Sequence, residues 1–247
     1  MKQITANTRW QTWCIYGPSG GGKTTLAATA PKPVFLDSNQ GLLSIAGRPG
    51  FEHVRAIDVH GMRDLERGYA ACAGQSKANW KSKFDTIVFD HFDDIQDLVM
   101  NELGEAAAGR DDRRDPDAME QREWGIMGNR LRRYLRKFKQ IPMHKILICG
   151  EKEDRETGRM GPALVGALRS QLPYFCDQTL YLRIGAKGHR YLHLDPSDSF
   201  YAKTRAWWLP ERKLAVPFDD TTFLTRLFAQ IAAGPTGASS TRSRTET

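Results

Sequence analysis

The sequence predicts an α/β fold, a mostly parallel sheet flanked by helices with an antiparallel hairpin at one edge. Short apolar runs alternate with segments of helical spacing, and a glycine-rich loop follows the first apolar run directly. Such alternation favours a parallel sheet covered by helices. Two later strand-like runs, Tyr174–Ile184 and His189–Leu194, are joined around Gly185 and Gly188, which is typical of a hairpin.

The most informative stretch reads Gly17-Pro18-Ser19-Gly20-Gly21-Gly22-Lys23-Thr24 and fits the P-loop pattern G-x-x-x-x-G-K-[S/T]. The apolar run Trp13–Tyr16 before it is typical of a buried strand, and Thr24–Ala30 after it predicts a helix that Pro31 stops. Glycines let backbone N–H groups surround phosphate oxygens, and the helix N-terminus adds partial positive charge. We therefore expect a nucleoside-triphosphate site. A glycine-rich turn with a chance lysine would lack these flanking elements.

Within this site, each polar side chain has an expected role. Lys23 is expected to reach the β- and γ-phosphates, and the Thr24 hydroxyl to hold Mg²⁺, with Thr25 beside them. A second apolar strand, Phe84–Asp90, ends in an acid, as the Walker B pattern does. A carboxylate at the end of a parallel strand lies near the P-loop, so Asp90 is predicted to hold the water shell of Mg²⁺.

The remaining segments continue the alternation. Helices are predicted over Met62–Ala73, Ile95–Leu103, Glu120–Gln140 and Phe218–Ala233, and further strands over Pro33–Asp37, His53–Ile57 and His144–Gly150. Asp93 and Asp94 are interpreted as acids at a helix N-terminus, where the dipole favours them. Two charged segments that contain glycine, 104–120 and 151–166, are predicted to be mobile loops. One domain is expected over residues 10–233, between an irregular lead at 1–9 and a disordered tail at 234–247.

Composition limits the class of protein. The chain has 247 residues, 40% of them hydrophobic, which agrees with a globular protein. Its net charge of +7 favours an acidic partner, of which nucleic acid is the commonest. The four cysteines form no C-x-x-C pair, which favours buried free thiols in a reducing cytosol. Without a run of about 18 apolar residues, the sequence predicts neither a secreted nor a membrane-spanning protein.

Several motifs together resemble phage-encoded RecA-core ATPases, the group of compact single-strand annealing or phage nucleotide-binding proteins. They are GPSGGGKTT, VFLD, FDTIVFD, the spacing from Ile141 to Glu153, GPALVG and AKTR, and they cover most of residues 12–216. The resemblance implies a RecA-like fold, ATP and Mg²⁺ as ligands, contact with single-stranded DNA, and a role in phage recombination or annealing in the host cytoplasm. It also implies that the strand at 144–149 lies between the P-loop strand and the strand that ends at Asp90.

The resemblance also suggests sites outside the P-loop. The segment after Cys149 matches the place where RecA-type proteins carry a DNA-binding loop, which makes Lys152, Arg155 and Arg159 candidates for DNA contact. Lys203 and Arg205 match a basic motif that, in oligomeric relatives, reaches the γ-phosphate of a neighbour. That implies a homo-oligomer, a ring or a filament; ordinary surface charge is the alternative.

Independently of the resemblance, the helix predicted at 120–140 carries a basic face. Arg132 and Arg136 on this face are candidates for contact with a polynucleotide backbone, although a charged face of a helix is usually only solvated.

One position departs from the RecA pattern. RecA-type enzymes carry a glutamate after the second strand that positions the attacking water, and Asn39 stands there in this chain. An amide orients water but cannot accept its proton. Glu151 or Asp37 is a possible replacement, and slow hydrolysis is an open alternative.

Three functions therefore compete. The first is an ATPase stimulated by single-stranded DNA, with a single-strand-binding protein as a further candidate partner. The second is a DNA-binding module that ATP switches without appreciable hydrolysis. The third is a small-molecule P-loop kinase whose lid would be the 104–120 segment with Arg110, Arg113 and Arg114.

Overall fold

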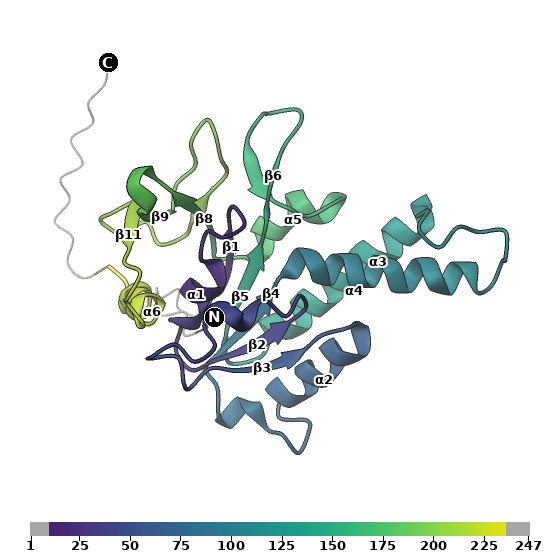
Figure 1. Cartoon of the computed structure of the whole chain (residues 1–247), viewed down its shortest axis with the longest axis horizontal. Helices are drawn as coiled ribbons and strands as arrows, with labels where there is room; N and C mark the ends of the chain where they lie inside the picture. The colour runs from purple at the N-terminus through teal and green to yellow at the C-terminus, as the bar shows by residue number, and fades with distance from the viewer. Residues whose placement is uncertain (1–9, 236–247) are drawn as a thin grey trace, which may run out of the picture.

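The computed structural model describes residues 10–235. Within them, nine strands form one sheet in the order β11-β9-β8-β1-β5-β4-β2-β3, with β10 paired to β8 (Figure 1). The strands are β1 (Thr12–Tyr16), β2 (Pro33–Asp37), β3 (Arg55–Asp58), β4 (Thr86–Asp90), β5 (His144–Cys149), β8 (Gln178–Ile184), β9 (Arg190–His193), β10 (Lys203–Thr204) and β11 (Lys213–Val216). The mostly parallel α/β sheet with flanking helices confirms the predicted fold class.

The centre of the sheet is parallel and enclosed. β1 pairs in parallel with β5 on one side and β8 on the other, and β4 lies between β5 and β2. The strand at 144–149 thus lies between the P-loop strand and the Asp90 strand, as expected. All residues of β1, β2, β4 and β5 are buried. Helices cover both faces of a parallel sheet, which is why these strands are apolar runs without alternation.

Helices form a layer on each face. α2 (Met62–Cys72), α3 (Phe92–Ala108), α4 (Gln121–Lys139) and α5 (Ala167–Phe175) pack on one face, and α1 (Lys23–Ala28) and α6 (Phe223–Ala233) on the other. The Trp13 ring of β1 stacks on Phe228 of α6 at 3.9 Å between centroids. Figure 1 shows α3 and α4 running side by side beyond the sheet.

The antiparallel edge begins beyond β8. β8 pairs in parallel with β1 through one edge and antiparallel with β9 through the other, and β11 continues the antiparallel pairing. The predicted hairpin is therefore confirmed, although its first strand begins at Gln178 and not at Tyr174. Tyr174 instead lies in the last turn of α5, a helix that was not predicted and that Leu168 and Leu172 anchor in the core.

The segment 151–166, which was predicted to be a mobile loop, contains regular secondary structure. β6 (Glu151–Glu153) and β7 (Met160–Pro162) form a two-stranded antiparallel hairpin. Asp154 organises its turn, because its carboxylate accepts hydrogen bonds from the N–H groups of Glu156 and Thr157. Gly158 adopts a positive φ of 67° in the same turn. Both strands have only three residues and β6 is charged, so hydropathy gave no sign of them.

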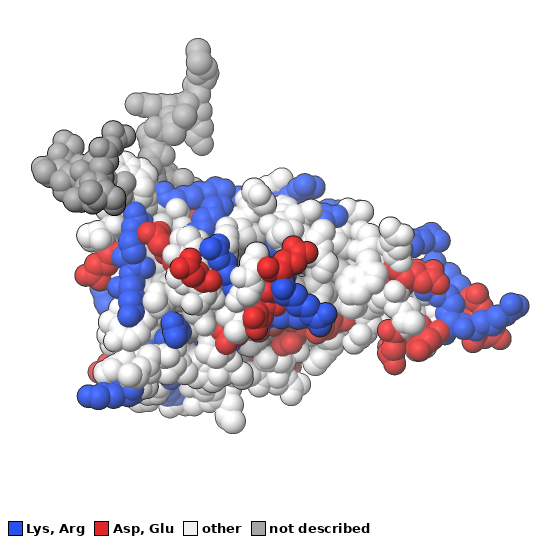
Figure 2. Space-filling model, turned by 90° about the horizontal axis from the view of Figure 1, so that it is seen from above, with Lys and Arg blue, Asp and Glu red and all other residues white. Residues whose placement is uncertain are grey.

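The segment 104–120, also predicted to be a mobile loop, is helical in its first part. α3 continues to Ala108, so the first part of the predicted loop is helical. Beyond it, the Arg114 guanidinium donates to both carboxylate oxygens of Glu123 at 3.3 and 3.2 Å. Figure 2 shows acidic and basic side chains together at this tip of the molecule.

The other predicted helices and strands are present, with shifts of boundary. Asp93 and Asp94 lie in the first turn of α3, and all four cysteines are buried free thiols. No helix within residues 10–235 has the length and hydropathy of a membrane span. The predictions for residues 1–9 and for most of the tail lie outside the described residues.

Candidate nucleotide-binding site

The P-loop connects the carboxyl end of β1 to the start of α1. Gly20 and Gly22 adopt φ values of 70° and 88°, a region that costs little only for glycine. The Gly21 N–H donates to the Pro18 carbonyl at 3.1 Å, which closes a turn inside the loop. α1 begins directly after Gly22, so its first N–H groups belong to the loop that a phosphate would enter.

The Lys23 side chain is folded over the loop. Its Nζ donates to the carbonyls of Gly17 at 3.0 Å and Pro18 at 2.9 Å, and the residue is only 4% exposed. Burial lowers the pKa of Lys23, while the charges of Asp93 and Asp90 act in the opposite direction. A buried ammonium beside acids and a glycine loop is a suitable partner for phosphate oxygens.

Asp90 ends β4 next to this cation. Its carboxylate is fully buried, and both oxygens lack a well-formed hydrogen bond. Burial raises the pKa of Asp90 to about 6, while the nearby His91, Thr24 and Lys23 act in the opposite direction. His91 Nε2 lies 3.2 Å from Asp90 Oδ1.

This donor set fits Mg²⁺. A buried carboxylate without hydrogen bonds gains a partner when it faces a cation, directly or through water. No group of three or more His, Cys, Asp or Glu side chains within residues 10–235 forms a metal cage of its own. Thr24 and Asp90 would therefore hold the ion together with phosphate oxygens, which is how Mg²⁺ usually binds beside nucleotides.

Two other acids at this edge of the sheet accept hydrogen bonds from the backbone. Asp37 is the register partner of Asp90, and its Oδ1 accepts the N–H groups of Asn39 at 3.2 Å and Gly41 at 3.4 Å. Asp93 Oδ2 accepts the Gly150 N–H at 2.9 Å, which ties α3 to the end of β5. Asn39 is exposed, so the position of the RecA glutamate holds an amide at the surface.

Glu151 lies close to the P-loop, where the sequence analysis placed it. Its negative charge favours the protonated form of Lys23, and its Oε2 is buried without a hydrogen bond. Burial raises the pKa of Tyr181 to about 12, and a hydrogen bond with Glu151 contributes to that shift. Glu151 is thus an acid near the phosphate-binding lysine that is not committed to an ion pair.

Arg190 is a residue of this site that the sequence analysis missed. It begins β9, and its guanidinium carbon lies 3.0 Å from the position that a Cβ on Gly22 would occupy. The same guanidinium lies 4.8 Å from the centroid of the Phe218 ring, and Arg48 lies 4.2 Å from that centroid. Within the described residues, Arg190 has no ion pair. Only the fold brings it to the P-loop, so no sequence motif could reveal it.

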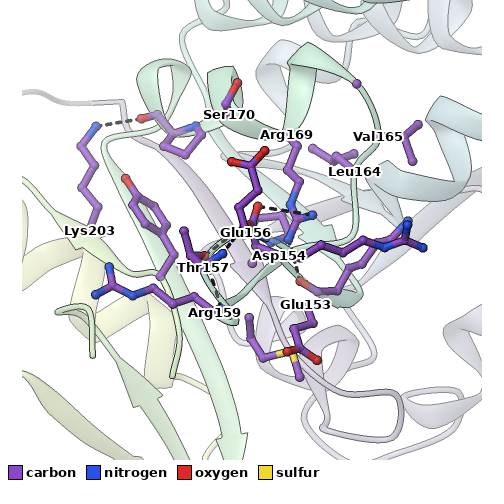
Figure 3. A pocket seen from close by; sticks show the side chains of 18 of the residues that line it. Glu153, Asp154, Glu156, Thr157, Arg159, Leu164, Val165, Arg169, Ser170 and Lys203 are labelled. Carbon is purple, nitrogen blue, oxygen red and sulfur yellow. Dashed lines mark hydrogen bonds and ion pairs between the residues drawn. The ribbon is translucent and has the colours of Figure 1, made fainter. Parts of the chain in front are cut away.

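The predicted DNA-binding residues do not form one surface. Lys152, Arg155 and Arg159 line a cavity of about 880 Å³ between the β6–β7 hairpin and α5 (Figure 3). Acids line it too, and Arg159 lies 3.8 Å from Asp198. Arg132 on α4 donates to Gln171 on α5 at 2.7 Å, outside this cavity.

Arg136 stacks over the Phe175 ring at 5.8 Å, also between α4 and α5. Its guanidinium and that of Arg132 therefore already have partners within the chain. Whether any of these residues contacts DNA stays a prediction.

Lys203 and Arg205 lie away from the P-loop of their own chain. Lys203 Nζ donates to the Pro173 carbonyl at 2.7 Å and lines the cavity of Figure 3. Arg205 pairs with Asp177 at 2.9 Å, and Asp177 Oδ2 accepts the Thr12 N–H at the opposite end of β1. A contact with the nucleotide of a neighbouring chain stays a prediction.

A family model described as an AAA domain matches residues 9–206, which include the whole P-loop, Asp90 and Arg190. The chain belongs to this family. No curated protein matches it. The AAA domain is a P-loop ATPase domain, so the match agrees with a site built from Lys23 and Asp90.

Proposed function

We propose that this AAA-domain protein is an ATPase that single-stranded DNA stimulates, and that it acts in recombination or annealing in the manner of phage RecA-like proteins. The observation that carries the nucleotide part is that Lys23, at the start of α1, and Asp90, at the end of β4, are both buried beside the glycine loop. The net charge of +7 and the resemblance of its motifs to RecA-core proteins support the DNA part.

Different residues would bind the phosphates and the metal ion at the nucleotide site. The N–H groups of residues 20–24 and the Lys23 ammonium would bind phosphate, and Thr24 and Asp90 would hold Mg²⁺. When bound, Mg²⁺ supplies positive charge to the phosphate oxygens. Lys23 adds a second fixed positive charge that is already desolvated.

Glu151 is the acid that we assign as general base. It is half-buried, its Oε2 has no hydrogen bond, and it lies near Lys23. Asp37 is less suitable, because its Oδ1 already accepts backbone N–H groups in the turn after β2. Glu151→Gln is expected to lower the turnover rate at least 100-fold and to leave ATP affinity within about threefold, since general-base catalysis is worth about 10²–10⁴.

A specific observation supports slow turnover as the second candidate. Asn39, where the RecA pattern has a glutamate, is exposed and is not an acid, so the role of base falls to an acid elsewhere, for which we assign Glu151. If Glu151 does not act as a base, the chain is an ATP-switched DNA-binding module. The kinase alternative loses support, because Arg114 of the presumed lid is already held by Glu123.

We also propose a homo-oligomer in which Lys203 or Arg205 faces the nucleotide of a neighbour, because neither reaches the P-loop within one chain. Mixing experiments test this. If Lys23→Ala and Arg205→Ala proteins regain activity when combined, the arginine acts across an interface; if every mixture stays inactive, it does not.

The DNA part is tested by hydrolysis measured with and without a single-stranded oligonucleotide. A rise in turnover that disappears in high salt supports the proposal, because phosphate contacts release counterions. The proposal is overturned if DNA leaves the turnover rate unchanged and the protein does not bind the oligonucleotide at low salt.

A further inference from the structure

The antiparallel edge of the sheet has two chemically different faces. Successive residues of a strand point to opposite faces, and the register places Arg183 opposite Tyr191, and Lys213 opposite His193. These four side chains therefore share one face. Arg190 and Leu192 point to the other face, toward α1 and the apolar core on that side.

The first face is hollowed. A depression of about 600 Å³, which we call the basic hollow, lies over β8, β9 and the start of β11. Its polar and aromatic lining consists of Arg183, Lys187, His189, Tyr191, His193 and Lys213. None of the residues that line it is an acid. A concave surface with several cations and no carboxylate attracts polyanions.

The cations of the basic hollow are not neutralised by acids among the described residues. Within residues 10–235, no ion pair or hydrogen bond occupies the side chains of Arg183, Lys187 or Lys213. The charges of Lys213 and Arg183 add to burial in lowering the pKa of His193, so the local potential is positive.

The larger cavity beneath the β6–β7 hairpin differs in this respect. There Arg169 lies 3.8 Å from Asp154, Arg159 lies 3.8 Å from Asp198, and Lys203 donates to a backbone carbonyl. Three acids also belong to its lining. The basic hollow is smaller than this cavity, but no acid in its lining neutralises its cations.

An aromatic ring lies among these cations. Lys213 Nζ is 4.1 Å from the centroid of the Tyr191 ring. Gly185 packs closely on the ring edge, since a Cβ there would come within 2.9 Å of Tyr191 Cε2. The ring is thus fixed by the turn of the hairpin. A fixed aromatic ring between cations is the combination that binds unpaired bases and their backbone phosphates.

The hollow is joined to the nucleotide site by the same two strands. The Leu182 carbonyl of β8 packs so closely on Gly17 that a Cβ there would lie 2.2 Å from its oxygen. Arg190, which contacts Gly22, directly precedes Tyr191 in β9. Adjacent residues of one strand therefore touch the P-loop and line the hollow.

We propose that the basic hollow binds single-stranded DNA, with phosphates at Arg183 and Lys213 and a base stacked on Tyr191. The inference rests on the proposed function and identifies a surface that the sequence motifs did not indicate. It also gives DNA a short structural connection to the P-loop through β9.

The test is equilibrium binding of a fluorescent oligothymidylate by anisotropy, at several salt concentrations. Arg183→Gln with Lys213→Gln is compared with Arg110→Gln with Arg113→Gln, an equal loss of charge at the exposed tip beyond α3. The first pair is expected to weaken binding on the order of tenfold and to reduce the salt slope by about 1.4, which is about 0.7 for each of two phosphate contacts. The tip pair is expected to stay within about twofold.

A third variant, Tyr191→Leu, separates stacking from charge. It is expected to weaken binding about fivefold or more without changing the salt slope, and to remove the preference for oligothymidylate over an abasic strand of equal length. Binding of a fluorescent ATP analogue by each variant verifies that the chain is folded.

Two failures can be told apart. If the wild type binds no oligonucleotide at low salt, the proposed function fails and the inference with it. If the wild type binds but the hollow pair behaves like the tip pair, or Tyr191→Leu keeps the base preference, the inference alone is overturned.

Discussion

The Tyr16 hydroxyl holds two distant segments at the base of the P-loop. Tyr16 ends β1 directly before Gly17 and is fully buried. Its hydroxyl contacts the carbonyls of Met160 in β7, at 3.1 Å, and of Tyr201 before β10. Tyr16→Phe removes only this oxygen, and the ring keeps its packing against Tyr181 at 5.0 Å between centroids.

The loss of stability in Tyr16→Phe depends on which carbonyl loses its hydrogen-bond donor. Met160 O also accepts the Tyr201 N–H at 2.9 Å, so it stays bonded. Tyr201 O would be left without the donor that Tyr16 supplies. A buried carbonyl left without a donor costs about 1–3 kcal/mol, and because the contact with Tyr201 O is only part-buried, we expect a loss no greater than the middle of that range. For a chain of this size, a loss of about 2 kcal/mol lowers the melting temperature by about 4–8 °C.

Calorimetry and urea denaturation test this, with Tyr174→Phe as the matched control. Tyr174 is 77% exposed, so loss of its hydroxyl is expected to change the free energy of unfolding by less than about 0.5 kcal/mol. The Tyr201 amide is also expected to exchange faster with deuterium in Tyr16→Phe. Equal stability of the two variants would refute the assigned role of the Tyr16 hydroxyl.

Three further predictions concern pH, the loop and the metal ligand. Burial lowers the pKa of His144 from 6.5 to about 4, so between these pH values the unfolded chain binds a proton that the folded chain does not. About 3 kcal/mol of stability, fully present above pH 6.5, is therefore lost as the pH falls to 4. In urea titrations, His144→Gln should lose less stability than the wild type between pH 7.5 and 4.5. Gly22→Ala places a Cβ on a residue whose φ is 88° and brings it against Arg190, so ATP binding measured by calorimetry should weaken more than tenfold. The control Gly47→Ala, with a φ of 67° and open space around it, should suffer the backbone strain alone and bind ATP normally. Asp90→Asn removes a buried charge that has no well-formed hydrogen bond. Without nucleotide, the free energy of unfolding of the variant should therefore equal or exceed that of the wild type, within about 1 kcal/mol, while Mg²⁺-dependent hydrolysis is lost. Strong destabilisation would show a structural role instead.

The P-loop and the parallel core were predictable because their signals are local. Trp13–Tyr16 and Phe84–Asp90 are apolar runs between polar turns, and covered parallel strands need that pattern. The resemblance to RecA-core proteins gave the order of β1, β5 and β4, which the structure confirms. The AAA family match agrees with the P-loop ATPase class and leaves the particular phage family as a prediction.

The parts that were missed depend on long-range contacts or on charged strands. β6 consists of Glu151, Lys152 and Glu153, so its pairing with β7 is invisible to hydropathy. Arg190 reaches the P-loop only because β9 folds back beside β8. The basic hollow collects residues from three strands, and the predicted cations beneath the hairpin turned out to lie beside acids.

We propose that ATP is hydrolysed at Lys23 under the control of single-stranded DNA. The most direct measurement is ATP hydrolysis with and without single-stranded DNA, for the wild type beside Lys23→Ala. We expect DNA to raise a rate that the variant lacks at every DNA concentration. A variant that hydrolyses ATP like the wild type would contradict the nucleotide site, and a wild-type rate that DNA leaves unchanged would contradict its control by DNA.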